Sequence, residues 1–61
     1  MASKEWERTY RSMRKAGFAK EVATHQADWE LCYEKIKARR FRLGDKRPIS
    51  DAEVGRMVSD L

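Results

Sequence analysis

Hydrophobic residues recur along this chain at the 3.6-residue period of an α-helix, and no segment alternates strictly between apolar and polar positions. The first stripe places Trp6, Tyr10 and Met13 at i, i+4 and i+7, which predicts an amphipathic helix. We expect this helix to begin after Ser3 as its N-cap. It should end near residue 16, because Gly17 follows and glycine favours the left-handed conformation that terminates helices.

A second and longer stripe predicts a helix that starts near Phe18 and runs as far as Arg42. At about 100° per residue, its apolar positions cluster on one face, with Tyr33 at the edge of that face. Thr24 offers a cap for a fresh helix, but the stripe keeps its phase there, so we favour one continuous helix. The two stripes predict a helical hairpin that turns at Gly17. The residues of the long stripe are Phe18, Val22, His25, Trp29, Cys32, Ile36 and Leu43.

A loop over residues 43–48 separates this hairpin from a short third helix. Ser50 and Glu53 stand at the two positions of a capping box, with Ile49 and Val54 at the hydrophobic-staple positions around it. The apolar face of the third helix is formed by Val54, Met57, Val58 and Leu61. The predicted fold is therefore all-α, a helical hairpin plus a short capped C-terminal helix, in a single domain over residues 1–61.

Two features limit the stability of such a fold. Gly55, inside the third helix, costs up to ~1 kcal/mol relative to alanine, so it either permits close helix approach or leaves the helix marginal. A chain of 61 residues also buries only roughly 60% of its unfolded surface. Cys32 and His25 are the only cysteine and histidine, which excludes an intrachain disulfide and a zinc site of several such ligands. Self-association, or docking on a larger partner, is the remaining way to supply buried area.

Charge and hydropathy bear on where the protein resides. The first six residues are already charged and contain no apolar run, so we expect no signal peptide. No apolar stretch approaches the 18 or so residues of a membrane span, and we expect no membrane partner. One unpaired thiol suits a reducing compartment. The sequence therefore predicts a cytoplasmic protein.

Charge is strongly segregated along the chain, although the net value is only +4. Residues 1–17 sum to +3, residues 18–34 to −3, residues 35–49 to +6 and residues 50–61 to −2. Most of the positive field therefore arises from one short stretch.

The polar residues provide no catalytic centre. His25 and Cys32 lie about 10 Å apart along one helix, whereas a Cys–His dyad needs contact within about 3 Å. Glu30 and Glu34 form an i, i+4 pair on a polar helix face, which is typical of solvated carboxylates. No glycine-rich phosphate loop is present. We therefore predict a protein that is not an enzyme and uses no cofactor or metal.

The basic stretch is the leading candidate for a binding site. Lys35, Arg39 and Arg42 share one helix face, and Phe41 points roughly opposite to Lys35 and Arg39, away from the predicted core. Guanidinium groups pair with phosphates, and an exposed ring stacks on an unpaired base. The alternative is an ordinary solvated face, with Phe41 packed under the third helix. The candidate nucleic-acid or partner contacts are Lys35, Lys37, Arg39, Arg40, Phe41, Arg42, Lys46 and Arg47, supplemented from the first helix by Arg11 and Lys15.

The segment over residues 11–22, read as RS-x-RKAGFAKEV, resembles the junction between the first two helices of the bacterial small-subunit ribosomal protein twenty-one family. A YEK tripeptide and a basic run follow in both, here at residues 33–35 and beyond, after about five extra residues. Residues 23–32 are acidic and aromatic rather than basic, and the third helix has no counterpart in that family. The resemblance implies a hairpin that binds ribosomal RNA through Arg11, Lys15, Lys35, Arg39 and Arg40.

Two functional hypotheses follow. The first is a small non-enzymatic protein that engages nucleic acid, RNA in preference to DNA, or a ribonucleoprotein through residues 35–47. The second is a regulatory protein that inhibits or adapts a larger enzyme or complex through aromatic and arginine hot spots. One tryptophan would then serve as an exposed anchor, although we expect Trp29 in the hairpin seam. A homo-oligomer formed through the long helix is a third possibility.

Overall fold

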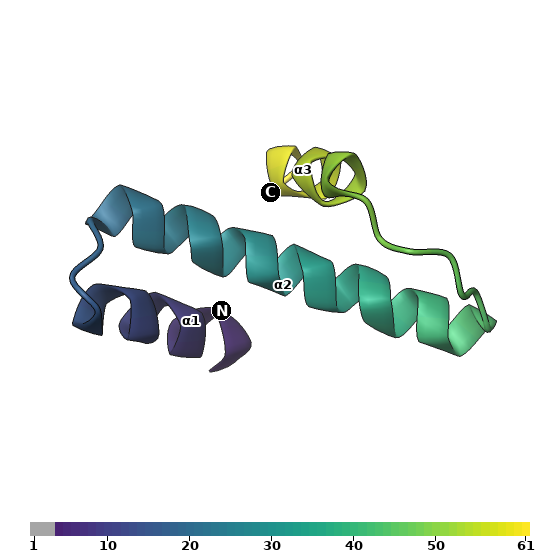
Figure 1. Ribbon diagram of the computed structural model, residues 1–61, viewed down its shortest axis with the longest axis horizontal. Coiled ribbons are helices and arrows are strands. Elements are labelled where there is room, and N and C mark those ends of the chain that lie inside the picture. The colour runs from purple at the N-terminus through teal and green to yellow at the C-terminus, as the bar shows by residue number, and fades with distance from the viewer. Residues whose placement is uncertain (1–3) are drawn as a thin grey trace.

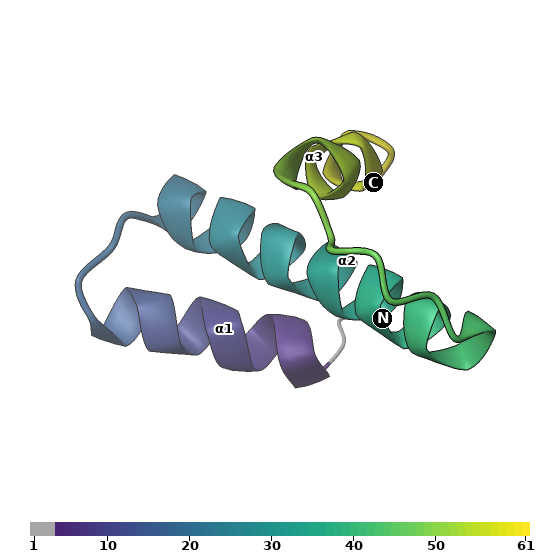
Figure 2. The same ribbon diagram turned by 45° about the vertical axis from the view of Figure 1, so that its right-hand side comes forward.

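The computed structural model describes residues 4–61 and contains the helices α1 (Lys4–Lys15), α2 (Lys20–Leu43) and α3 (Asp51–Ser59). The prediction of an all-α fold with three helices is confirmed. α2 lies in the middle, with α1 along one side and α3 on the opposite side (Figure 1). A second view, turned by 45°, shows the same order (Figure 2). Within residues 4–61, α1 and α3 make no contact with each other. The predicted N-cap, Ser3, lies outside the described residues.

Glycines in the left-handed conformation end the first two helices. Gly17 has φ 98°, and its amide donates to the carbonyl of Arg14 at 3.0 Å, while the next amide donates to Met13 at 3.1 Å. This pair of hydrogen bonds is a Schellman motif, which satisfies carbonyl groups left free at a helix end. Gly44, with φ 70°, ends α2 with the same two bonds. The predicted turn at Gly17 is confirmed.

α2 is continuous from Lys20 to Leu43, so the favoured reading without a break at Thr24 is confirmed. It begins two residues later than predicted, because Ala19 adopts an extended conformation as its N-cap. Ala19 has no side chain that accepts a hydrogen bond from the first turn. α2 therefore begins without a side-chain cap, and its position depends on packing against α1 and α3.

The long helix has two apolar faces. The prediction that its long apolar stripe packs against the first helix is wrong, because that stripe packs against α3. Trp29, Cys32 and Ile36 pack against α3, in a cluster with the side chains of Val54, Ile49, Met57 and Val58. α1 packs on the opposite face, where Ala23 and Ala27 are fully buried. Trp29 is therefore not in the hairpin seam. Phe18, Val22 and Leu43 are also not core residues, because their side chains are 47%, 47% and 72% exposed.

The predicted stripe of α1 is half-buried and contains no fully buried residue. The rings of Trp6 and Tyr10 stack, with centroids 5.1 Å apart and planes 9° from parallel. The indole Nε1 of Trp6 donates to Oδ1 of Asp28 at 2.7 Å, which links α1 to α2. A hydrogen bond to a charged group of this kind contributes about 1.5–3 kcal/mol. The hairpin seam therefore combines small residues on α2, the half-buried stripe of α1 and the Trp6–Asp28 hydrogen bond.

α3 has the predicted N-cap, Ser50, whose Oγ accepts a hydrogen bond from the Glu53 amide at 3.2 Å. Of the predicted capping box, the serine caps the helix. The carboxylate of Glu53 instead pairs with Arg40 and anchors α3 to α2. A Cβ built on Gly55 would meet Trp29 at 3.9 Å, an ordinary contact. Close helix approach therefore does not require this glycine. Leu61, predicted on the apolar face, is 66% exposed.

The arrangement is elongated. Its principal extents are 37 × 21 × 21 Å, and its Cα radius of gyration is 12.5 Å. A compact chain of this length has a radius of gyration of about 10.5 Å. The difference follows from helices that lie on opposite sides of α2 and do not close into a bundle.

Candidate nucleic-acid interface

The C-terminal end of α2 projects beyond the ends of both neighbouring helices (Figure 1). Phe41, in its last turn, is 89% exposed, so the alternative in which it packs under α3 is wrong. Leu43 beside it is 72% exposed. The basic residues that surround this end are exposed as well: Lys35, Lys37, Arg39, Arg42 and Lys46. We call this group, together with Phe41, the basic tip.

Arg40 differs from the other basic residues of this segment. Its side chain is 14% exposed and forms ion pairs with Glu53 and, at 3.9 Å, with Asp45. It also donates a hydrogen bond to the Arg47 carbonyl at 3.0 Å. Arg40 therefore connects α2, the loop and α3, and its guanidinium is already engaged by carboxylates. For this reason we leave it out of the binding surface predicted from the sequence.

Asp45 organises the loop that follows α2. Its carboxylate accepts hydrogen bonds from the Arg47 backbone amide at 3.0 Å and from the Arg47 guanidinium at 2.7–3.1 Å. The side-chain bonds from Arg47, followed by the backbone bond, lower the pKa of Asp45 to about 2. The same pairing raises the pKa of Arg47. Arg47 stays 79% exposed, so it contributes to this surface with part of its charge compensated.

The basic residues of α2 point to different sides of the helix. Leu31, Lys35, Ala38 and Arg42 follow at i, i+4, i+7 and i+11, so they share one side. Leu31, Lys35 and Ala38 line a depression together with residues of α1, which identifies this side as the one that α1 covers. Lys35 and Arg42 therefore point toward the α1 side, and Phe41 lies about 100° around the helix from Arg42.

The two basic residues predicted from the first helix lie away from the basic tip. Lys15 ends α1 beside the Gly17 turn, near the start of α2. The distance along α2 from Lys20 to Arg39 is roughly 28 Å at 1.5 Å per residue. Arg11 lies one helical turn closer. The structure therefore separates the predicted contacts into two groups.

Sequence reasoning missed how α1 arranges its charge. Lys4, Arg8, Arg11 and Lys15 occupy positions i, i+4, i+7 and i+11, opposite the Trp6 stripe, and all four are exposed. The signal for this face in the sequence is the helical spacing of its basic residues. We call these four residues the α1 stripe. The Arg11 side chain is 81% exposed, and its 3.8 Å pair with Glu7 is a weak exposed interaction.

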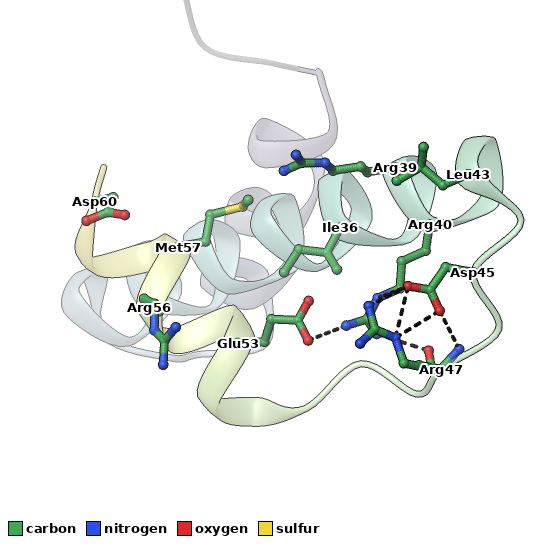
Figure 3. Close-up of a pocket in the computed structure, with 10 residues that line it drawn as sticks. All are labelled: Ile36, Arg39, Arg40, Leu43, Asp45, Arg47, Glu53, Arg56, Met57 and Asp60. Atoms are coloured by element: carbon green, nitrogen blue, oxygen red, sulfur yellow. Dashed lines mark hydrogen bonds and ion pairs between the residues drawn. The ribbon is translucent and has the colours of Figure 1, made fainter.

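A shallow groove of about 440 Å³ runs between the second half of α2 and α3 (Figure 3). Glu53 and Arg40 point toward each other across it (Figure 3). Three carboxylates line the groove together with four arginines: Asp45, Glu53 and Asp60 with Arg39, Arg40, Arg47 and Arg56. This near-balance of charge makes the groove a weaker anion site than the open basic tip.

The thiol and the imidazole occupy different environments. Cys32 is fully buried beneath α3, and burial raises the pKa of its thiol. His25 is exposed, with its ring centroid 6.0 Å from that of Trp29. Within the described part of the chain, no three His, Cys, Asp or Glu side chains gather as metal ligands. Over the same residues, no helix combines the length and apolar character needed to cross a membrane.

Comparison of the chain with known protein families, with curated proteins and with solved structures finds no match.

Proposed function

We propose that this protein is a non-enzymatic binder of nucleic acid, or of a ribonucleoprotein, and that the basic tip of α2 is its contact surface. RNA is favoured over DNA because of the resemblance over residues 11–22. The expected location is the cytoplasm, where the thiol of Cys32 remains reduced.

The observation that carries this proposal is an aromatic ring, 89% exposed, at the centre of a basic helix end. Exposing Phe41 to water forgoes about 1.5–3 kcal/mol of burial free energy, so a solvated face would favour a polar residue there. Stacking on an unpaired base covers such a ring and contributes about 1–3 kcal/mol. The surrounding ammonium and guanidinium groups pair with the phosphates of the same strand.

Phe41→Ala tests the ring directly. We expect single-stranded RNA to bind with an affinity lower by roughly 5- to 150-fold, the equivalent of one stacked base. Phe18→Ala is the matched control, because Phe18 is also a partly exposed phenylalanine but lies in the turn before α2, at the end opposite Phe41. Fluorescence anisotropy with a labelled oligonucleotide measures both variants. Equal losses in the two variants, or no binding of RNA or DNA at low salt, would contradict the proposal.

Arg42→Glu tests the charge. Binding should weaken, and the dependence of affinity on salt should become less steep, because each lost phosphate contact retains its counterions. Arg56→Glu, an exposed arginine on α3, provides the matched charge reversal away from the basic tip. A similar loss in both variants would indicate a response to net charge alone.

A second candidate function is regulation of a larger enzyme or complex by direct binding. It is favoured by apolar side chains that the elongated fold leaves open, namely Phe18, Val22 and Leu61, which are 47%, 47% and 66% exposed. Purification from nuclease-treated lysate separates the two functions. A protein partner retained after nuclease treatment supports regulation, and material lost with the nucleic acid supports the first proposal. A dimeric mass for the isolated protein would indicate a second copy as the partner.

A further inference from the structure

The outer face of α1 is chemically distinct from the basic tip. The α1 stripe spans about 17 Å from Lys4 to Lys15, at 1.5 Å per residue. α1 carries five basic and two acidic residues, a net charge of +3. One of the acidic residues, Glu7, contacts Arg11 at 3.8 Å in an exposed pair, which leaves most of the positive charge uncompensated.

No aromatic ring accompanies the α1 stripe. Trp6 and Tyr10 stack on each other on the opposite, half-buried side of the helix, and Trp6 is bonded to Asp28. α1 therefore presents charge without a stacking platform. A row of cations on a straight helix suits the regularly spaced phosphates of a duplex backbone and carries no base readout.

The α1 stripe and the basic tip form one track. Arg8 lines the same depression as Lys35, where the first turns of α1 meet α2. Three glutamates line it as well, so the positive charge is locally balanced at this junction: Glu5, Glu30 and Glu34. From Lys35, Arg42 continues the track on the α1 side of α2, toward the end of α2 that projects beyond α1 (Figure 1). The molecule is 37 Å long, which corresponds to about 11 base pairs at 3.4 Å each. Phe41 lies at one end of this track.

We propose that the nucleic acid recognised is a duplex that ends in an unpaired strand, with the α1 stripe on the duplex phosphates and Phe41 on the first unpaired bases. This inference rests on the proposed function and specifies its substrate class. It also gives the ring of Phe41, which is 89% exposed at one end of the charged track, a ligand to cover it.

Three labelled probes, each made as RNA and as DNA, test this inference. They are a blunt duplex of about 12 base pairs, the same duplex with a single-stranded overhang, and a single strand of about 12 nucleotides. The overhang probe should bind most tightly. Arg8→Gln combined with Arg11→Gln should reduce the salt slope on both duplex probes by about 1.8, since each duplex phosphate contact contributes about 0.9. The same variant should leave binding of the single strand unchanged.

Phe41→Ala should give the reverse pattern. Affinity for the overhang and single-stranded probes should fall roughly 5- to 150-fold, and the blunt duplex should be unaffected. Arg56→Gln on α3 is the matched control and should change none of the three. If the protein binds the single strand, but its affinity for the duplex probes is the same in the Arg8 and Arg11 variant, this inference is overturned and the proposed function stands. No binding to any probe at low salt would overturn both.

Discussion

On one side of α2, two fully buried alanines bring α1 close, and the Trp6–Asp28 hydrogen bond joins the helices at 2.7 Å. On the other side, α3 rests on an apolar cluster around Ile36 and on the ion pair between Arg40 and Glu53. The α1 side contains no buried residue from its own helix, whereas α3 contributes Val54, which is 1% exposed. One helix therefore supports two interfaces of different physical character.

The difference has a functional consequence. α1 contributes its apolar stripe to the seam and keeps a continuous basic stripe for solvent. Glu53 of α3 pairs with Arg40, which also binds the carbonyl of Arg47 in the loop. α3 is therefore held beside the middle of α2, and the C-terminal end of α2 stays exposed to solvent. The positive residues are thus concentrated on the α1 side and at the basic tip, away from the acidic third helix.

Ile36→Ala should have the largest effect on stability, at the interface between α2 and α3. Removing a buried isoleucine side chain costs about 2–5 kcal/mol, a large part of the stability of a small domain. α3 should detach while the α1–α2 hairpin persists, because α1 does not contact α3 within the described residues. Amide hydrogen exchange resolved by residue measures this. Leu43→Ala, at a 72% exposed position, should change stability by less than about 0.5 kcal/mol. Equal loss of protection in α1 would show that the two interfaces are not independent.

Ala27→Leu should break the other interface at an intermediate cost. Alanine 27 has no exposed surface, so a larger side chain forces α1 away, which costs about 1–3 kcal/mol. The Trp6 indole N–H resonance should shift as its bond to Asp28 is lost, while the Val54 methyl signals remain. Ala38→Leu, on the same side of α2 but exposed, is the control. An unchanged Trp6 resonance would refute the close approach of α1 at Ala27.

A pH titration should produce the smallest effect, confined to the loop beside α3. The pKa of Asp45 is lowered from 3.8 to about 2 in the folded protein. Its contribution to stability is therefore fully present above pH 4 and is lost as the pH falls toward 2. The Arg47 Nε–H resonance should report loss of the pair over that range. Asp45→Asn should show no such transition, and a transition retained in this variant would assign it to another carboxylate.

Local signals in the sequence were sufficient for the elements themselves. The Trp6 stripe, the glycine at position 17 and Ser50 as an N-cap define helix periods and ends through contacts within a few residues. The phase of Phe41 differs from that of the long apolar stripe, which favoured an exposed ring but left open its packing under the third helix. Such features depend on neighbours along the chain and so can be read from it.

The partners of each face required the tertiary structure. Trp29, Cys32 and Ile36 form a stripe whose spacing is compatible with packing against either α1 or α3. The alanines at positions 23 and 27 are weakly hydrophobic, although they lie fully buried in the hairpin seam. Arg40 and Glu53 were read as a binding residue and a capping residue, yet they pair across 13 positions of sequence. Helix periodicity specifies which side chains share a face, while packing and long-range charge decide what each face meets. In this protein the sequence by itself determined three helices and an exposed basic end. Only the tertiary structure decided that α2 lies between α1 and α3, and which arginines remain free to bind.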